Sequence, residues 1–313
     1  MTYFIGVDGG ASKTAAIVVD ETGRKLGSGL AGASNHLRVG IQEATRNVER
    51  AVNMALVEAG IAIKDVEYAY CGIAGSDHPT HREKVIEALQ VFFPRGNFIV
   101  DTDARIALTG AIGFGAGIVV ISGTGSVAFG RNSAGQEGRA GGWGPTLGDE
   151  GSGFWIAREG LSAIVRAHDG RGFATHMTDL LCAEYDLCSP DDLPRFVYAT
   201  TTHVDDIARY GKLVIEAAQA GDDIARGILA RAGSELAECV LAIARKLHMA
   251  DADFPVAHVG GAFHAGDLLL NPMRLRLQRD APGATLQTPS FAPVEGAAMM
   301  AMRAAQAPRV GRA

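Results

Sequence analysis

Two short glycine-rich loops, each between apolar segments of strand length, most constrain the fold of this 313-residue chain. The first loop, residues 8–14 (DGGASKT), lies between the apolar segments 3–8 and 15–20. The second, residues 122–126 (SGTGS), follows the apolar segment 117–122 and is again followed by a strand-like segment. Segments of this kind predict strands. We therefore infer a diverged internal duplication, which is a better guide to the fold than any single element.

The remaining pattern predicts strands alternating with helices. Apolar residues recur at helical spacing over residues 41–60, where Gly60 suits a helix end. Further strands are predicted at residues 25–30, 66–74, 97–100, 127–131 and 256–259, and further helices at 81–93, 104–111, 151–166, 224–247 and 294–305.

Composition and charge exclude several classes of function. The net charge is −6 and no block of Lys or Arg stands out, which argues against a nucleic-acid-binding surface. No apolar run approaches the ~20 residues needed to cross a bilayer. The first residues lack the basic region of a signal peptide, so a cytoplasmic location is expected.

The four cysteines are scattered along the chain, and no Cys/His cluster has the spacing of a zinc site. Cys182 and Cys188 are near enough in sequence to pair, but a reduced state is the favoured interpretation. The other two are Cys71 and Cys239.

The first glycine-rich loop is a candidate phosphate site. Glycines allow the backbone to approach a phosphate, and the N–H groups of the turn donate to its oxygens. Asp8, at the strand end, is placed to hold a hydrated Mg²⁺. The candidate ligands are Asp8, Gly9, Gly10, Ser12, Lys13 and Thr14. A hairpin turn with an exposed lysine would also explain this loop taken alone.

The second and third glycine loops extend the same hypothesis. As the second copy of the unit, the loop of Gly123, Thr124, Gly125 and Ser126 would grip the β- and γ-phosphates together with the first. Neither loop is a Walker loop or a dinucleotide fingerprint, because a strand and not a helix follows each. Gly260 and Gly261 follow a predicted strand and would let an adenine lie on the backbone, although a strand-to-helix turn is the favoured explanation of this loop taken alone.

The order and spacing of the three loops resembles the acetate and sugar kinase, Hsp70 and actin superfamily. Residues 141–152 (GGWGPTLGDEGS), 34–36 (SNH) and 102–104 (TDA) narrow the match. They resemble the N-acetylglucosamine kinase branch, which is grouped with the BadF/BadG/BcrA/BcrD ATPases. The resemblance spans nearly the whole chain and is weakest at about residues 170–220.

This resemblance implies an α/β fold of two RNase-H-like (actin-like ATPase) domains with an interdomain cleft. The expected first domain is residues 1–114 plus 293–313, including the C-terminal helix. The expected second domain is residues 115–292, which carries helical insertions. Relatives of this kind are often homodimers, so a homodimer is expected.

The resemblance also assigns a catalytic base. Asp103 matches the carboxylate that takes the proton of the sugar 6-hydroxyl as it attacks the γ-phosphoryl group. Asp101 lies two residues away and, by the period-two alternation of a strand, could point the same way. Any Asp at this position could also cap the helix that follows.

The resemblance places the sugar near Asn35, Ser76 and Asp149, with Thr124 reaching both phosphate and sugar. Gly142, Trp143 and Gly144 match the sugar-binding segment. Each has a plainer explanation: Asn35 suits a turn, Trp143 could plug a core, and Asp149 could begin a helix.

The resemblance thus implies an ATP- and Mg²⁺-dependent amino-sugar kinase that phosphorylates the 6-hydroxyl of N-acetylglucosamine. Glu295-Gly296-Ala297 resembles glucosamine kinases of the same branch, which keeps that alternative open. A BadF-type ATPase that activates a partner reductase needs a cysteine to bridge an iron–sulfur cluster. No Cys lies at the Gly-Thr-Gly loop, but Cys71 keeps this alternative open too. A non-catalytic regulatory module is disfavoured, because Asp8, Asp103 and both loops are intact.

Overall fold

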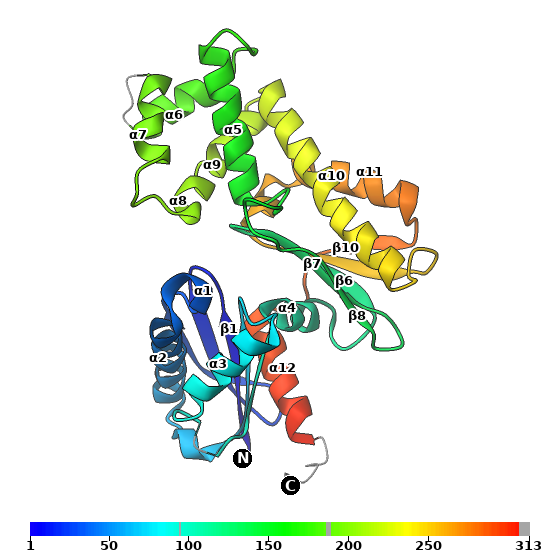
Figure 1. Ribbon diagram of the computed structural model, residues 1–313. Coiled ribbons are helices and arrows are strands. Elements are labelled where there is room, and N and C mark those ends of the chain that lie inside the picture. The colour runs from blue at the N-terminus through cyan, green and yellow to red at the C-terminus, as the bar shows by residue number, and fades with distance from the viewer. Residues whose placement is uncertain (94, 186–188, 307–313) are drawn as a thin grey trace. The chain divides into compact units, whose positions relative to one another are not determined.

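The structure, a computed structural model, describes residues 1–93, 95–185 and 189–306. The chain divides into two compact units, and each contains its own five-stranded sheet (Figure 1). The first unit is Met1–Gly115 together with the chain from Pro289 onward, and the second is Ala116–Thr288. Among the described helices, none combines the length and apolarity needed to span a bilayer.

The sheet of the first unit has the order β3-β2-β1-β4-β5. Strands β1 to β3 form an antiparallel meander, β4 runs parallel to β1, and β5 runs parallel to β4. The elements of this unit are β1 (Tyr3–Gly9), β2 (Thr14–Asp20), β3 (Lys25–Ala31), α1 (His36–Val39), α2 (Ile41–Ala59), η1 (Ile63–Asp65), β4 (Val66–Ile73), α3 (Pro79–Leu89), β5 (Phe98–Asp101), α4 (Asp103–Ile112) and α12 (Pro293–Gln306).

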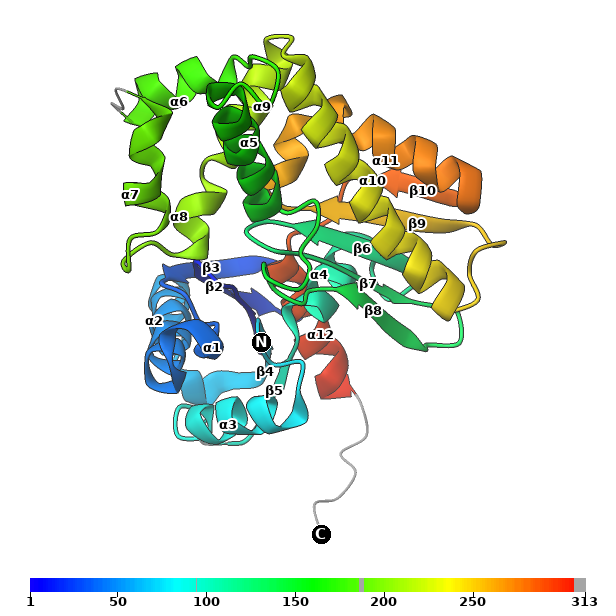
Figure 2. The same ribbon diagram turned by 45° about the horizontal axis from the view of Figure 1, so that its top comes forward.

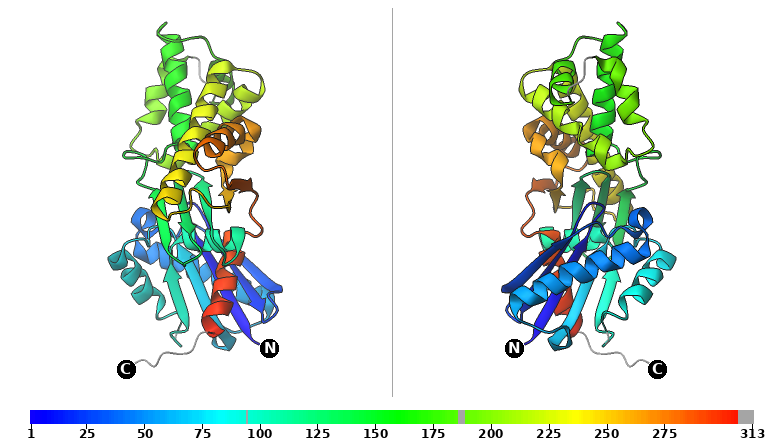
Figure 3. Two further views of the ribbon diagram at one scale, coloured as in Figure 1. Left: turned by 90° about the vertical axis from the view of Figure 1, so that its right-hand side faces the viewer. Right: turned by 90° about the vertical axis from the view of Figure 1, so that its left-hand side faces the viewer.

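Both faces of this sheet are covered by apolar side chains. Successive side chains of a strand point to opposite sides, so a mostly apolar strand such as β1 contributes to both faces. On one face Ile5 and Val7 pack with Val48 of α2. On the other face Phe4 packs with Ala298 of α12. Figure 3 shows α2, in blue, and α12, in red, on opposite sides of the sheet. Helix α12, near the end of the chain, therefore packs in the core of the first unit.

The sheet of the second unit, in the order β10-β9-β6-β7-β8, repeats this connectivity. Strands β6 to β8 form an antiparallel meander, and β9 and β10 follow in parallel to β6. The predicted internal duplication is confirmed. The elements are β6 (Gly117–Ser122), β7 (Ser126–Arg131), β8 (Glu137–Gly141), α5 (Gly153–His168), α6 (Met177–Tyr185), η2 (Pro190–Asp192), α7 (Leu193–Val197), α8 (Val204–Ala208), α9 (Gly211–Gln219), α10 (Asp223–Lys246), β9 (Phe254–Val259), η3 (Gly261–Ala265), α11 (Asp267–Asp280) and β10 (Ala284–Gln287).

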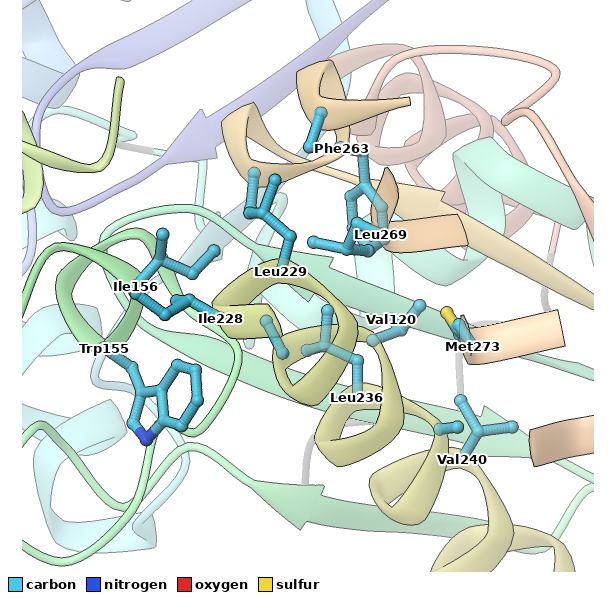
Figure 4. Close-up of a cluster of buried hydrophobic side chains, with 14 of the residues drawn as sticks. Val120, Trp155, Ile156, Ile228, Leu229, Leu236, Val240, Phe263, Leu269 and Met273 are labelled. Carbon is cyan, nitrogen blue, oxygen red and sulfur yellow. The ribbon is translucent and has the colours of Figure 1, made fainter. Parts of the chain in front are cut away.

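Helix α10 lies along this second sheet and forms the centre of a large apolar core. Figure 4 shows part of that core, in which Leu229 and Leu236 of α10 lie near Val120 of β6, Phe263 of η3 and Leu269 of α11. Burying such a side chain fully contributes about 1.5–3 kcal/mol. Helices α5 to α9 form a group beside α10 (Figure 2).

The predicted strands and helices are confirmed, apart from shifts at their ends, but several elements were not predicted, among them α1, β8, β10 and α11. The third helix begins at Pro79 and ends at Leu89, not at residues 81 and 93. Proline is favoured in the first turn of a helix, where its missing N–H costs nothing. The missed elements have weak signals. Strand β8 contains two glycines, β10 has only four residues, and α11 contains Pro272.

Candidate active site

The first glycine loop is a tight hairpin between β1 and β2. The N–H of Gly10 donates to the carbonyl of Lys13 (2.9 Å), and Ser12 and Lys13 are exposed. Ala11, which follows the two glycines of the loop, does not adopt a positive φ. The loop tip therefore has a backbone conformation that an alanine adopts without strain.

Two hydroxyl groups lie on the inner side of this loop. Thr14 is buried and donates to the carbonyl of Gly32 (2.7 Å), so its hydroxyl supports the hairpin from within. Ser34 is buried against Gly9, and a Cβ added to Gly9 would collide with the Ser34 hydroxyl. Glycine is therefore required at position 9 by close packing.

Asp8 lies at the end of β1, in register with Gly72 of β4, which is itself in register with Asp101 of β5. Burial raises the pKa of Asp8 to about 6, and the nearby Lys13 ammonium partly offsets this rise. The carboxyl ends of the parallel strands thus bring acidic side chains to one edge of the sheet.

Asp103 is the first residue of α4, just beyond the same edge. The helix is capped by Thr102, whose hydroxyl accepts a hydrogen bond from the N–H of Arg105 (3.3 Å). Thr102 and not Asp103 is therefore the N-cap. The Asp103 carboxylate accepts a hydrogen bond from the N–H of Ala104 (2.9 Å).

The electrostatic surroundings of Asp103 are those of a base. Burial raises its pKa to about 7, and the negative charges of Asp8 and Asp77 contribute to the rise. A carboxyl group whose pKa lies near neutrality is suited to accept a proton at physiological pH. Perturbed groups of this kind concentrate at functional sites.

Asp101, the alternative base, already has several partners. Its carboxylate accepts hydrogen bonds from the Tyr70 hydroxyl (2.6 Å) and the Thr102 N–H (2.8 Å). It also forms an ion pair with Arg105, and Arg82 lies 3.7 Å away. The oxygens of this carboxylate are thus already engaged by structural partners and are not free to bind a substrate hydroxyl. The geometry therefore favours Asp103 over Asp101 as the base.

Asn35 and Ser76 lie beside the first loop. The N–H of Asn35 donates to the carbonyl of Gly10 (3.2 Å), and its side chain caps α1 by accepting from Leu37 N–H (3.1 Å). Its carboxamide oxygen would lie 2.8 Å from a Cβ at Gly75. Ser76 is buried, and its hydroxyl has no hydrogen-bond partner among the described residues.

The second glycine loop, in the second unit, is held by the segment that begins α5. The N–H of Gly153 donates to the carbonyl of Gly123 (2.8 Å), and the Ser126 hydroxyl donates to the carbonyl of Glu150 (2.8 Å). Within the loop, Gly123 N–H donates to Gly125 O (3.0 Å). These bonds fix the loop before any ligand binds.

Asp149 joins this loop to the segment that contains Trp143. Its carboxylate accepts hydrogen bonds from the N–H groups of Gly144 (3.2 Å) and Ser126. Asp149 is buried and has a φ of 60°, which non-glycine residues rarely adopt. Burial raises its pKa, and the two backbone hydrogen bonds oppose the rise.

Trp143 does not plug a core, because 68% of its surface is exposed. Its ring is covered on one side by Arg139, whose guanidinium carbon lies 5.2 Å from the ring centroid. Gly142 and Gly144, on either side, have φ values of 72° and 84°. This backbone holds the indole on the surface, where it is accessible to a ligand.

The third loop adjoins the second. Gly260, with a φ of 120°, lies so close to Ser122 that a Cβ there would collide with the Ser122 carbonyl. Gly261 then begins the 3₁₀ helix η3, and both glycines are exposed. Thr124, at the tip of the second loop, accepts a hydrogen bond from Phe154 N–H through its carbonyl (3.3 Å).

The structure thus gathers the predicted residues into two groups, one in each unit. The first contains Asp8, Lys13, Asn35, Ser76 and Asp103. The second contains residues 123–126, 142–144, 149, 260 and 261. Sequence reasoning missed the network of Tyr70, Arg82 and Arg105 around Asp101, because these three side chains are scattered over 36 positions of β4, α3 and α4.

The described part of the chain contains no group of three or more His, Cys, Asp or Glu side chains that could hold a metal ion. Cys71 is fully buried in β4, and burial raises the pKa of its thiol to about 12. A thiol in this position is neither accessible nor ionised. The pairing of Cys182 with Cys188 cannot be compared with the structure, since Cys188 lies outside the described residues.

Comparison with known proteins gives a consistent picture. The model of the BadF/BadG/BcrA/BcrD ATPase family matches residues 5–301. An N-acetyl-D-glucosamine kinase of Dictyostelium discoideum is 31% identical over 96% of this chain and 97% of its own. An N-acetylmuramic acid/N-acetylglucosamine kinase of Clostridium acetobutylicum is also 31% identical, over 90% of this chain and 92% of its own.

A solved structure is similar as well. It is a proposed N-acetylglucosamine kinase of Chromobacterium violaceum, with 28% identity, a TM-score of 0.76, and coverage of 96% of this chain and 99% of its own. Two five-stranded mixed sheets with flanking helices are the pattern of two actin-like ATPase domains. The predicted fold class is therefore confirmed.

Proposed function

The chain belongs to the BadF/BadG/BcrA/BcrD ATPase family, and from this membership we propose that it is an ATP-dependent amino-sugar kinase. The favoured reaction transfers the γ-phosphoryl group of ATP to the 6-hydroxyl of N-acetylglucosamine. Both curated relatives described above are kinases whose names include that sugar.

One observation of the site carries the proposal. Asp103 lies at the first turn of α4 with its pKa raised to about 7, while Asp101 beside it is occupied by Tyr70 and Arg105. In the proposed reaction, Asp103 accepts the proton of the sugar hydroxyl as that oxygen attacks the γ-phosphorus. The bond to the β-phosphate oxygen breaks, and ADP leaves.

The glycine loop of each unit is a candidate phosphate-binding element. In the first, the backbone N–H groups at the tip and the ammonium of Lys13 would donate to phosphate oxygens. In the second, Thr124 and Gly125 lie in a loop that is already held by hydrogen bonds to the start of α5. Gly260 and Gly261 are exposed glycines on which an adenine could stack.

Mg²⁺ is the implied metal, and it would neutralise phosphate charge during transfer. The residues present fit an ion held mainly by phosphate and water. Asp8 is a half-buried carboxylate at a strand end, and burial raises its pKa. Asp8 would accept hydrogen bonds from metal-bound water, and the nearby positive charge would favour its ionised form.

Each unit contains its own candidate sugar contacts, which are Asn35 and Ser76 in the first unit and Trp143 and Asp149 in the second. Ser76 brings a buried hydroxyl without a partner among the described residues. Trp143 brings an exposed aromatic surface, the kind of surface that packs on the apolar face of a sugar. Thr124, Gly142 and Gly144 complete the proposed set.

Two observations weigh against the alternatives. The buried Cys71 thiol does not suit an iron–sulfur cluster bridged between two chains, as a reductase activator would need. The segment of Glu295, Gly296 and Ala297, which resembles glucosamine kinases, makes contacts that stabilise the fold. The Glu295 carboxylate accepts from Ala292 N–H (2.8 Å), and Gly296 packs on the backbone of α4.

The test is ADP release with Mg²⁺ and ATP in the presence of single sugars. The panel is N-acetylglucosamine, N-acetylmuramic acid, glucosamine, N-acetylmannosamine, glucose and no sugar. The proposal expects the highest kcat/KM with N-acetylglucosamine and little ADP without sugar. Equal ADP release with and without sugars would refute the kinase. A clear preference for glucosamine would keep the reaction and change the substrate.

A further inference from the structure

The buried carboxylate of Asp101 has no part in the proposed chemistry, yet it joins the elements around Asp103. It lies at the last position of β5, and only 3% of the residue is exposed. Its partners come from three other elements: Tyr70 from β4, Arg82 from α3 and Arg105 from α4. Asp101 and these three partners, which we call the junction, therefore connect β5 with β4, α3 and α4.

The junction fixes the turn that presents Asp103. Arg105 and Asp103 both belong to the first turns of α4, and the ion pair of Arg105 with Asp101 attaches that part of the helix to β5. The hydrogen bond from Tyr70 attaches the same carboxylate to β4 (2.6 Å). The direction in which Asp103 points therefore depends on Asp101.

The junction also reaches the segment after β4. Arg82 lies 3.7 Å from the Asp101 carboxylate, and its Nε donates to the carbonyl of Ser76 (3.1 Å). Asp77 follows directly and is one of the charges that raise the pKa of Asp103. Asp101 is thus connected to the first turn of α4, which contains Asp103, and through Arg82 to the segment of Ser76 and Asp77.

We propose that Asp101 is a positioning residue for the phosphoryl transfer, which acts by holding the first turn of α4 and so aiming the Asp103 carboxylate at the sugar hydroxyl. The proposal rests on the proposed kinase function. Its reason is geometric, because an error of about 1 Å in the position of a reacting group can cost roughly 100-fold in rate.

The test compares Asp101→Asn, Asp103→Asn and the double variant in the ADP-release assay with N-acetylglucosamine. Asp101→Asn should lower kcat about 10- to 100-fold, with the KM of the sugar changed less than about 3-fold. The double variant should be no slower than Asp103→Asn, since a residue that acts through Asp103 has nothing left to position. Asp65→Asn, an exposed carboxylate in the same unit, is the matched control.

Tyr70→Phe keeps the buried ring and removes only one hydrogen bond, so it gives a second measurement if Asp101→Asn folds poorly. It should lower kcat in the same direction without changing the KM of the sugar. Wild-type kcat in both variants would overturn the proposal, and so would a double variant much slower than Asp103→Asn. Absence of sugar-dependent turnover in the wild type would instead refute the proposed function.

Discussion

Asp149 and Gly125 are in contact so close that no side chain fits between them. A Cβ added to Gly125 would lie 2.6 Å from the Asp149 carboxylate. That carboxylate is held on the backbone N–H of Gly144. The second glycine loop and the segment of Trp143 are therefore joined through one buried acid, and a change in either is expected to affect the other.

The first prediction concerns this contact. Gly125→Ala should raise the KM for ATP at least about 10-fold, because the new methyl group must displace either the loop or the carboxylate. Gly227→Ala is the matched control, since Gly227 lies exposed in α10 and nothing occupies the space of its Cβ. The control should keep the wild-type KM and gain about 0.5–1 kcal/mol of stability. An unchanged KM in Gly125→Ala would contradict the assignment of this loop.

The second prediction concerns Asp103. Asp103→Asn should lower kcat roughly 10²- to 10⁴-fold, the contribution typical of a general base. Its affinity for N-acetylglucosamine, measured by calorimetry without turnover, should stay within a few-fold of wild type. An Asp103→Asn enzyme with the wild-type kcat would show that another group takes the proton.

The third prediction concerns pH and activity. Burial and neighbouring carboxylates raise the pKa of Asp103 to about 7. The pH profile of kcat/KM should therefore have an acidic limb with an apparent pKa near that value, below which activity falls. The base must be ionised, so activity rises with pH through this range. A profile that stays flat from pH 5.5 to 8 would contradict the electrostatic description of the site.

The fourth prediction concerns pH and stability. The folded state raises the pKa values of Asp103 to about 7 and of Asp8 to about 6, so it binds these protons more tightly than the unfolded chain. This contribution to stability is complete below about pH 4 and is lost as the pH rises through the folded values. At pH 8, Asp103→Asn should therefore melt at least roughly 2–4 °C above wild type. The difference should shrink as the pH falls, and a variant that melts lower at pH 8 would contradict this.

The fifth prediction separates the two tryptophans. Trp143 is exposed and Trp155 is buried in the core of the second unit (Figure 4). Trp143→Ala should weaken sugar binding with little change in melting temperature. Trp155→Ala should destabilise the protein by about 3–5 kcal/mol. A Trp143→Ala variant with unchanged sugar KM would remove Trp143 from the proposed site.

The features predicted best from the sequence are those with local causes. The hairpin around Gly10 and the helix capped by Gly60 follow from turn residues and apolar spacing. The duplicated connectivity followed from two similar loops. Strand β10 could not be predicted, because its four residues become a strand only beside β9.

The candidate site was predicted as a set of residue types, and the structure adds their partners. The spacing of Asp101 and Asp103 left two candidates for the base. The family resemblance assigned the role to Asp103, and the three-dimensional contacts add a physical reason. The sequence alone could not show that reason, because the side chains of Tyr70 and Arg82 come from distant positions in the chain. Likewise, the sequence allowed Trp143 to be a core residue, whereas the structure shows it exposed between two glycines of positive φ.

The most direct test of the account is to identify where the phosphate goes. Purified protein, Mg²⁺-ATP and N-acetylglucosamine would be incubated, and the products examined by ³¹P and ¹H NMR. The account predicts one new phosphomonoester on the 6-oxygen of the sugar, formed in equal amount to ADP. ADP accompanied only by inorganic phosphate, with the sugar unchanged, would contradict it.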